Sequence, residues 1–330
     1  MNRKVSVAPM MDCTDKHERY FLRLISKNVL LYTEMIVSEA IDRGDREKLL
    51  SFNLEEKPVA LQLGGSSPKL LSNAAKIGED FGYDEINLNL GCPSKKVQKN
   101  KFGACLIKEP KLVADCLSEM QSKTKLPVTV KTRIGYDQVE DYESLYNFIK
   151  ILSSTGVKTF IIHARKAMLG KFTPKQNLNI PPLKYEMVYK LKKDFNDLEI
   201  IINGGISSTE DIKTHLKSVD GVMMGRSIYH SPYILADIEK EIFNNYDLLS
   251  REQVIESLIP YLKNEVRLGT RINQVMRHTL GLFHGKTGSS YWKRYLSENM
   301  CVRDADIKKI DHILDKVKLA PNAHSVGQID

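Results

Sequence analysis

Eight short apolar stretches rich in β-branched residues recur along the first two thirds of this chain. They cover residues 5–10, 30–36, 58–63, 85–90, 127–132, 159–164, 199–203 and 221–224. Segments of helical length and composition lie between most of them, at 68–81, 110–122, 141–154, 183–195 and 209–217. Almost continuously apolar strands are typical of a parallel sheet covered by helices on both faces. Eight of them at even spacing predict an α/β fold closed into a (β/α)₈ TIM barrel, and an open doubly wound sheet is the competing architecture.

The strand pattern stops after about residue 234. Residues 251–318 instead predict several helices with breaks at Gly269, Gly285 and Gly288, which indicates a small helical domain. From Pro321 onward the chain is polar and poor in apolar residues, which predicts a disordered tail. We therefore expect a catalytic TIM barrel over residues 1–240, a small C-terminal helical domain over 241–320 and a tail over 321–330.

Cysteine usage and the lack of targeting signals indicate a cytoplasmic enzyme. The five cysteines form neither a CxxC pair nor a Cys/His cluster, which argues against a disulfide framework and against a metal site. The first eleven residues are too short and too interrupted for a signal peptide. No apolar run approaches the ~20 residues that span a bilayer, so we expect no membrane association, and a monomer is the default.

Seven of the eight predicted strands end in polar, cationic or glycine-rich positions. In strand order they are Pro9 and Met10; Gln62; Asn89 and Cys92; Lys131 and Arg133; His163 and Arg165; Asn203, Gly204 and Gly205; and Gly225 and Arg226. Each one alone has a structural explanation, since a lone histidine is more often a satisfied core residue. Because the C-terminal strand ends of a barrel meet at one face, the set indicates a single pocket.

The last two strand ends indicate a phosphate site, and the fourth indicates a reactive thiol. Barrels commonly bind phosphate after strands seven and eight, where Gly204, Gly205 and Gly225 permit close backbone approach and Arg226 can hold an oxyanion. No G-x-G-x-x-G motif is present, so a resident dinucleotide is not expected. Cys92 lies between Gly91 and Pro93 at a strand end, which predicts an exposed thiol; the alternative is a small buried hydrophobe.

Two basic regions favour a polyanionic partner. Between residues 260 and 295, Glu265 is the only acid against Lys263, Arg267, Arg271, Arg277, Lys286, Lys293 and Arg294, and the lone Trp292 adjoins the last two. Residues 144–185 carry seven bases and no acid. This pattern is more typical of a nucleic-acid surface than of a membrane surface, because neither region has an amphipathic stripe. A solvated lysine-rich surface is the alternative.

The chain resembles the tRNA-dihydrouridine synthases nearly from end to end. The resemblance rests on the segments SVAPM at 6–10, LYTEM at 31–35, NLNLGCPS at 87–94, VKTR at 130–133, HARKA at 163–167, INGGI at 202–206 and DGVMMGR at 220–226. The HARKA segment, IPPL at 180–183 and GLF at 281–283 look most like the subfamily that acts at D-loop positions 20 and 20a.

The resemblance implies a bound FMN and a transient NADPH, with NADH possible. It implies that Ala8, Pro9 and Met10 lie beside the isoalloxazine, that Gln62 meets its pyrimidine edge, and that Lys131 lies near the atoms that gain charge on reduction. His163, Asn203, Gly204, Gly205, Gly225 and Arg226 would hold the ribityl phosphate. Asn89 would contact a flipped uracil. Arg133, Arg165, Lys175, Leu178, Ser290, Lys293 and Arg294 occupy positions expected to contact tRNA.

The implied reaction gives Cys92 a role. Hydride passes from the flavin to carbon 6 of uracil, and the resulting enolate needs a proton at carbon 5. An unperturbed thiol, with a pKa of about 8.5, is mostly protonated at neutral pH and can supply that proton. A covalent nucleophile is the competing role and would need a lowered pKa.

Two positions depart from the family pattern, and two other functions compete with the implied one. Leu178 and Ser290 stand where relatives usually carry arginines that orient tRNA. The alternatives are an FMN barrel of the dihydroorotate dehydrogenase type and a tRNA-binding protein without turnover.

Overall fold

A computed structural model describes residues 1–300, and these fall into two compact units. The first unit contains residues 1–16 and 29–225. The second contains residues 17–28 and the described chain from Arg226 onward. The expected assignment of residues 1–240 to catalysis and 241–320 to tRNA binding stays a prediction, and the expected disordered tail lies outside the described residues.

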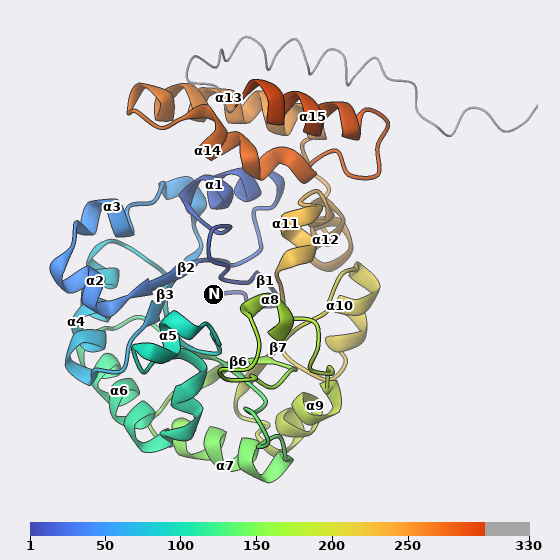
Figure 1. Cartoon of the computed structure of the whole chain (residues 1–330). Helices are drawn as coiled ribbons and strands as arrows, with labels where there is room; N and C mark the ends of the chain where they lie inside the picture. Colours follow the sequence, from blue (N-terminus) through green and yellow to red (C-terminus); the bar gives the residue numbers. More distant parts are fainter. Residues whose placement is uncertain (301–330) are drawn as a thin grey trace, which may run out of the picture. The chain divides into compact units, whose positions relative to one another are not determined.

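The first unit is a closed barrel of eight parallel strands. They are β1 (Val5–Val7), β2 (Leu31–Val37), β3 (Val59–Gly64), β4 (Glu85–Leu90), β5 (Val128–Arg133), β6 (Thr159–His163), β7 (Glu199–Asn203) and β8 (Gly221–Met224). Neighbours pair in the order β1-β8-β7-β6-β5-β4-β3-β2. A parallel bridge between Ser6 and Leu30 joins β1 to the start of β2, so the sheet closes. Figure 1 shows the strands as a ring inside an outer layer of helices, which confirms the TIM barrel over the open sheet.

The strand ends differ slightly from expectation. The first strand ends at Val7 instead of residue 10: Ala8 N still donates to Met224 O over 2.7 Å, but the next residue is Pro9, which has no N–H to donate. The fifth strand extends one residue further than expected and includes Arg133, which is in register with His163 on β6.

Helices form at the five segments where the apolar patterns predict them, and also at Ser38–Arg43 and Arg46–Leu50, which were not predicted. In the first unit they are α2 (Ser38–Arg43), α3 (Arg46–Leu50), α4 (Pro68–Asp80), α5 (Lys95–Lys99), α6 (Pro110–Lys123), α7 (Tyr142–Ser153), α8 (Pro174–Asn177), α9 (Tyr185–Asp194) and α10 (Thr209–His215), with 3-10 turns η1 (Leu54–Glu56) and η2 (Gly103–Lys108). Side chains of Ser67, Asp141 and Ser208 cap the N-termini of α4, α7 and α10. The short elements α5, η2 and α8 lie in the loops after β4 and β6 and were not predicted.

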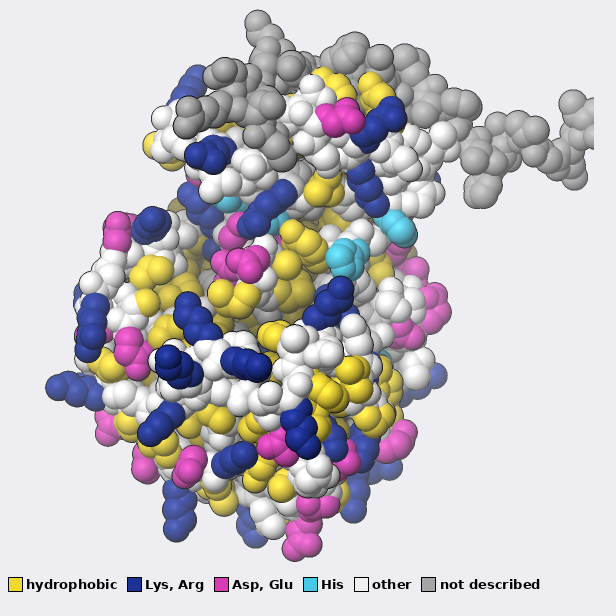
Figure 2. Space-filling view, viewed as in Figure 1, with side chains coloured by type: hydrophobic (Ala, Val, Ile, Leu, Met, Phe, Trp, Pro, Cys, Tyr) yellow, Lys and Arg dark blue, Asp and Glu magenta, His cyan; other side chains and the backbone are white. Residues whose placement is uncertain are grey.

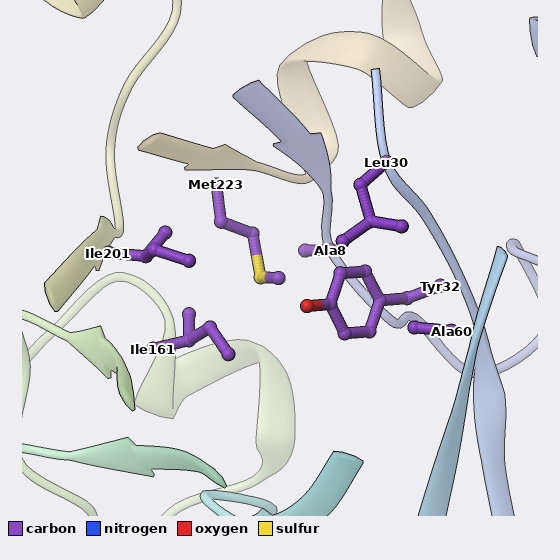
Figure 3. Close-up of a cluster of buried hydrophobic side chains, with 7 residues drawn as sticks. All are labelled: Ala8, Leu30, Tyr32, Ala60, Ile161, Ile201 and Met223. Carbon is purple, nitrogen blue, oxygen red and sulfur yellow. The ribbon is translucent and has the colours of Figure 1, made fainter. Parts of the chain in front are cut away.

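Apolar side chains fill the interior of the barrel. Figure 3 shows Ala8, Leu30, Tyr32, Ala60, Ile161, Ile201 and Met223 pointing toward one another from different strands, and all of them are buried. The Tyr32 hydroxyl reaches beyond this cluster and donates to Glu85 Oε1 over 2.7 Å. A buried phenol needs such a partner, because an unmade hydrogen bond in an apolar interior costs about 1–3 kcal/mol.

The second unit is helical. It contains α1 (Lys16–Ile25), α11 (Arg226–His230), α12 (Ile234–Phe243), α13 (Arg251–Arg267), α14 (Ile272–Met276), η3 (Arg277–Gly281) and α15 (Ser289–Asn299). The expected breaks at Gly269, Gly285 and Gly288 fall between these helices, and each of the three glycines has a positive φ. None of the helices formed within residues 1–300 is long and apolar enough to cross a membrane.

Trp292 belongs to the core of the second unit and not to its basic surface. The side chain is fully buried, its indole Nε1 donates to Thr279 O over 3.0 Å, and its ring packs against Phe283. Its position beside Lys293 and Arg294 in the sequence therefore does not make it part of the exposed basic surface. On α15 the indole lies on the inward face, whereas its two basic neighbours are exposed.

Candidate active site

The loop after β4 holds Cys92 at the barrel mouth. The Asn89 side-chain oxygen accepts hydrogen bonds from the backbone N–H of Gly91 over 3.1 Å and of Cys92 over 2.9 Å. From β5, Arg133 Nε donates to Gly91 O over 2.8 Å. Asn89 itself is fixed by its Nδ2, which donates to Gln62 Oε1 on β3 over 2.8 Å. Three neighbouring strands thus determine where the thiol lies.

The turn η2 supports the same loop from the other side. Ala104 N donates to Cys92 O over 3.0 Å, and a Cβ on Gly103 would stand 2.7 Å from that oxygen. Gly103 also has a φ of 74°, so both the space and the backbone angle require glycine there. This cover leaves Cys92 partly buried, whereas the sequence analysis predicted an exposed thiol. The thiol forms no disulfide with any described cysteine.

A lysine on β5 reaches the end of β7. Lys131 Nζ donates to Asn203 Oδ1 over 3.1 Å, and Asn203 Nδ2 donates to Met223 O over 2.8 Å. Burial and the positive charge of Arg133 lower the pKa of Lys131 to about 7, against an opposing effect of the thiolate form of Cys92. The amine is therefore close to its titration point at neutral pH and close enough to Cys92 to interact with its charge.

Two consecutive glycines open the backbone after β7. Gly204 and Gly205 have φ angles of 118° and 74°, and a Cβ on Gly204 would lie 2.7 Å from Cδ2 of His163. The Tyr185 hydroxyl, from α9, donates a hydrogen bond to Gly204 O over 2.8 Å. This bond fixes the orientation of the Gly204 carbonyl. Within residues 1–300, no hydrogen bond engages the backbone N–H of Gly204 or Gly205.

A glycine also follows β8. A Cβ on Gly225 would meet Met10 Sδ at 3.2 Å and Ala8 Cβ at 3.4 Å, so the first and eighth strands approach closely at this point. Pro9 and Met10 are partly buried, whereas Gln62 and His163 are almost fully buried. Arg226 follows as an exposed residue at the start of α11 and belongs to the second unit.

These features fit a flavin mononucleotide. Gly204 and Gly205 have backbone N–H groups that no hydrogen bond of the described chain engages, and such groups are of the kind that bind phosphate oxygens. Figure 2 views the face where the strands end: hydrophobic side chains of the barrel gather in a recess there, and both basic and acidic side chains of the barrel lie near it. No group of histidine, cysteine or acidic side chains in the described chain could hold a metal ion.

Two arginines expected to contact tRNA bond instead to loop backbone. Arg133 is buried, and its guanidinium donates to the carbonyls of Gly91, Lys166 and Asn177 over 2.8–3.2 Å. Arg165 donates to Pro181 O. Burial lowers the pKa of Arg133 to about 10, and the thiolate form of Cys92 opposes this. Their contact with tRNA stays a prediction, and their visible role is to connect the loops of the barrel mouth.

Asn177 is a structural residue that the sequence analysis missed. It is fully buried, its Oδ1 accepts from Met168 N over 2.7 Å, and its Nδ2 donates to three backbone carbonyls of the loop after β6. The neighbouring Lys175 is exposed and Leu178 is partly buried. No local pattern distinguishes a loop-organising asparagine from an ordinary surface one, because its partners are backbone groups, which every residue offers.

The exposed charges of the basic stretch of the second unit are all positive. All seven bases from Lys263 to Arg294 are exposed, as is Ser290. Glu265, the single acid among them, is buried and accepts a hydrogen bond from the Thr270 hydroxyl over 2.9 Å. The only negative charge in this stretch is therefore turned inward.

The basic region at residues 144–185 is partly neutralised. Lys166 and Lys184 both pair with Glu140, over 3.1 and 3.0 Å, and Lys158 pairs with Asp197 over 3.1 Å. These acids lie outside the stretch in sequence and return to it in space. Lys150, Lys171 and Lys175 are exposed and make no ion pair with a described residue.

Comparison with known proteins identifies the family. The family model described as "Dihydrouridine synthase (Dus)" matches residues 6–318. A protein of Synechocystis sp. named tRNA-dihydrouridine(20/20a) synthase is 53% identical over 91% of this chain and 90% of its own length. Proteins with the same name from Shewanella oneidensis and Escherichia coli K12 are 50% and 51% identical over 94% and 95% of this chain, and over 92% and 91% of their own. The chain belongs to the dihydrouridine synthase family, whose members are generally flavin-dependent.

Proposed function

We propose that this protein reduces uridine to dihydrouridine in the D-loop of tRNA, at positions 20 and 20a. The observation that carries the proposal is a thiol held at the mouth of a TIM barrel by three strands, in a chain 50–53% identical to tRNA-dihydrouridine(20/20a) synthases over more than 90% of its length. These relatives support this function over the competing interpretation as a barrel of the dihydroorotate dehydrogenase type.

FMN is the flavin that this barrel suits best. The N–H groups of Gly204 and Gly205 would hold its phosphate together with Arg226, and His163 lines the same strand end. Ala8, Pro9, Met10 and Gly225 would border the ring, and Gln62 would face its pyrimidine edge. NADPH would serve as a transient reductant, with NADH as the alternative.

A bound flavin supplies the hydride that is added to carbon 6 of the uracil ring. Cys92 then gives the proton of its Sγ to carbon 5 and is left as a thiolate, which solvent reprotonates. Lys131 and Arg133 lie close enough for their pKa values to respond to that thiolate, so both cations stabilise it as it forms.

Asn89 would orient the base. Its side-chain oxygen already accepts two backbone N–H groups, so both lone pairs are used. One Nδ2 hydrogen is given to Gln62, and only the second remains for a ligand. Asn89 can therefore donate to a carbonyl oxygen of uracil but cannot accept from its N3–H. The base must be flipped out of its stack to reach a barrel mouth.

The tRNA would be held by the exposed bases of the second unit, with Lys175 as a further phosphate contact. Leu178 and Ser290 stand where related enzymes carry arginines, so at these two positions tRNA would be held without charge. The proposed setting is a monomer acting in the cytoplasm, where its tRNA substrate is found.

Replacement of Cys92 tests the chemistry. Cys92→Ala should still bind flavin and oxidise NADPH with an artificial acceptor, while dihydrouridine formation, measured by mass spectrometry of digested tRNA, falls by about 10² to 10⁴-fold because the proton donor is lost. Cys105→Ala removes a nearby thiol on η2 and is expected to react like the wild type. Wild-type dihydrouridine formation by Cys92→Ala would assign the proton to another group.

A further inference from the structure

A continuous chain of hydrogen bonds crosses the barrel interior from Glu85 to the Cys92 loop. Thr129 Oγ1 donates to Glu85 Oε1 over 2.6 Å, and Asn87 Nδ2 donates to Thr129 Oγ1 over 2.8 Å. Gln62 Nε2 donates to Asn87 Oδ1 and Asn89 Nδ2 donates to Gln62 Oε1, both over 2.8 Å. Asn89 Oδ1 then accepts from the backbone at Gly91 and Cys92. We name this set the amide chain.

Glu85 is held firmly at the start of the amide chain. Its carboxylate is fully buried and pairs with Arg3 Nε over 2.7 Å. The Tyr32 hydroxyl donates to the same oxygen, Oε1, that Thr129 contacts. A carboxylate paired with arginine only accepts hydrogen bonds, so both hydroxyls must point their hydrogens at Oε1.

That fixed acceptor determines the direction of every bond that follows. Thr129 has one hydroxyl hydrogen, and it is committed to Glu85, so its oxygen can only accept from Asn87. The Asn87 amide must then turn its NH₂ to Thr129 and its oxygen to Gln62. Gln62 must in turn offer its oxygen to Asn89, whose own oxygen is left to receive the two backbone N–H groups.

The other end of the amide chain, at Asn89, independently requires the same direction of hydrogen bonding. Backbone N–H groups can only donate, so the atom of Asn89 that faces Gly91 and Cys92 has to be the oxygen. Both ends agree only if each of the three amides has a single orientation. A flipped amide anywhere in the chain would set two donors or two acceptors against each other in a buried place.

We propose that Glu85, Thr129 and Asn87 are positioning residues that fix the orientation of the Gln62 and Asn89 amides and thereby hold the Cys92 backbone. None of the three touches the thiol. For catalysis the inference rests on the proposed function, since it concerns the placement of the proton donor and of the asparagine that faces the base. As a structural statement it concerns this chain alone and is tested without substrate.

Thr129→Val tests it with Thr129→Ser as the matched control. Valine has the shape of threonine but neither donates nor accepts, whereas serine keeps the hydroxyl. The readout is the rate at which iodoacetamide alkylates Cys92 in the protein as purified, followed by peptide mass spectrometry so that the other cysteines are not counted. Melting temperature and flavin content are measured in parallel.

Cys92 of Thr129→Val should be alkylated about tenfold faster than in the wild type, because the loss of both hydrogen bonds of the Thr129 hydroxyl lets the loop open more often. Thr129→Ser should match the wild type. The proposal would be overturned if Cys92 were alkylated at the same rate in the wild type and in Thr129→Val. It would also be overturned if Thr129→Ser were alkylated as fast as Thr129→Val. A lower melting temperature with an unchanged alkylation rate would count against it too, because the hydroxyl would then serve stability only.

Asn87→Leu gives a second route if Thr129→Val does not fold. It removes the central link and leaves the bond from Thr129 to Glu85 in place. We expect the same increase in Cys92 alkylation, and a double variant no faster than either single one, because both act through one chain. Additive rates would show two independent effects and contradict the proposal. Because no step requires flavin turnover or tRNA, failure here is distinct from failure of the proposed function.

Discussion

At the scale of single residues, the barrel mouth combines a thiol with two cations whose pKa values are lowered by burial. Lys131 and Arg133 lie on β5 close enough to Cys92 to interact with its charge, and within residues 1–300 the Lys131 amine hydrogen-bonds to one side chain, that of Asn203. Such an arrangement favours an anion, whether a phosphate, a flavin or a thiolate. The protein keeps these cations there at a cost in stability.

The first prediction concerns that cost at Lys131. Its pKa falls from 10.5 to about 7 on folding, so between these values the unfolded chain binds more protons and the unfolding free energy rises with pH. Below about pH 7 both states are protonated and the full penalty of burial applies. Lys131→Met should therefore stabilise the flavin-free protein most at pH 6, with an advantage that shrinks as pH rises toward 10.

Urea unfolding of both proteins between pH 6 and 9.5 measures this difference. Lys158→Met is the control, because Lys158 is exposed and paired with Asp197 on the surface. A pH-independent difference between Lys131→Met and the wild type would mean that the folded amine titrates near its ordinary pKa.

At the scale of elements, strand ends and the turns that follow them build the site. β4 carries Asn89 and leads to Cys92, η2 supports that loop, and β7 leads into two glycines with positive φ. Each turn adopts a conformation that its own residues permit, but the distances between turns are set by the register of the parallel strands.

The second prediction uses the glycines after β7. Gly204→Ala would place a Cβ 2.7 Å from His163 at a φ of 118°, and we expect FMN affinity to fall at least about tenfold because the phosphate-binding backbone must shift. Flavin fluorescence titration of the flavin-free protein measures it. Gly170→Ala has a similar positive φ of 76° with nothing within 4 Å, so it should lose some stability and keep its FMN affinity. Equal losses in both would attribute the effect to backbone strain alone.

The third prediction concerns Arg226, which opens α11 directly after Gly225. Arg226→Ala should release most of the FMN, because a bidentate contact with a phosphate is lost. The flavin absorbance of purified protein, relative to its protein absorbance, gives the occupancy. Arg251→Ala, in the same unit but stacked on Tyr233, is the control. Stoichiometric flavin in Arg226→Ala would remove this residue from the phosphate site.

At the scale of the whole molecule, charge is distributed unevenly between sequence regions that look alike. Residues 144–185 recover acids from elsewhere in the barrel, whereas the seven bases of the second unit stay exposed and its one intervening acid is buried. The second stretch is therefore the stronger electrostatic surface. Phosphate contacts of this kind depend strongly on salt and carry little sequence information.

The fourth prediction tests that surface. Replacing Lys293 and Arg294 together with alanine should weaken tRNA binding and reduce the slope of log affinity against log salt by roughly one to two units, while NADPH oxidation with an artificial acceptor stays normal. A double variant of Lys76 and Lys158, both exposed and ion-paired, removes the same charge and should keep the wild-type slope. An unchanged slope for the first variant would leave these bases as solvated surface.

The sequence by itself determined the barrel, its strand order and the residues at its mouth. Local information sufficed there: a buried parallel strand needs a continuous apolar run, and the chemistry of a barrel is found at the C-terminal ends of such runs, as at Asn89, Lys131 and Gly204. The glycine breaks of the second unit were likewise visible, since glycine is the residue that most readily adopts a positive φ.

The tertiary structure alone decided which side chains face each other across strands. The burial of Trp292, the pairing of Glu140 with two lysines and the loop contacts of Asn177 all join residues that are distant in sequence or on opposite sides of a turn. The amide chain is the clearest case: Glu85, Thr129 and Asn87 look like ordinary strand residues. Their bonds exist because strand register places three polar side chains in line inside an apolar barrel, where each hydrogen can have only one acceptor.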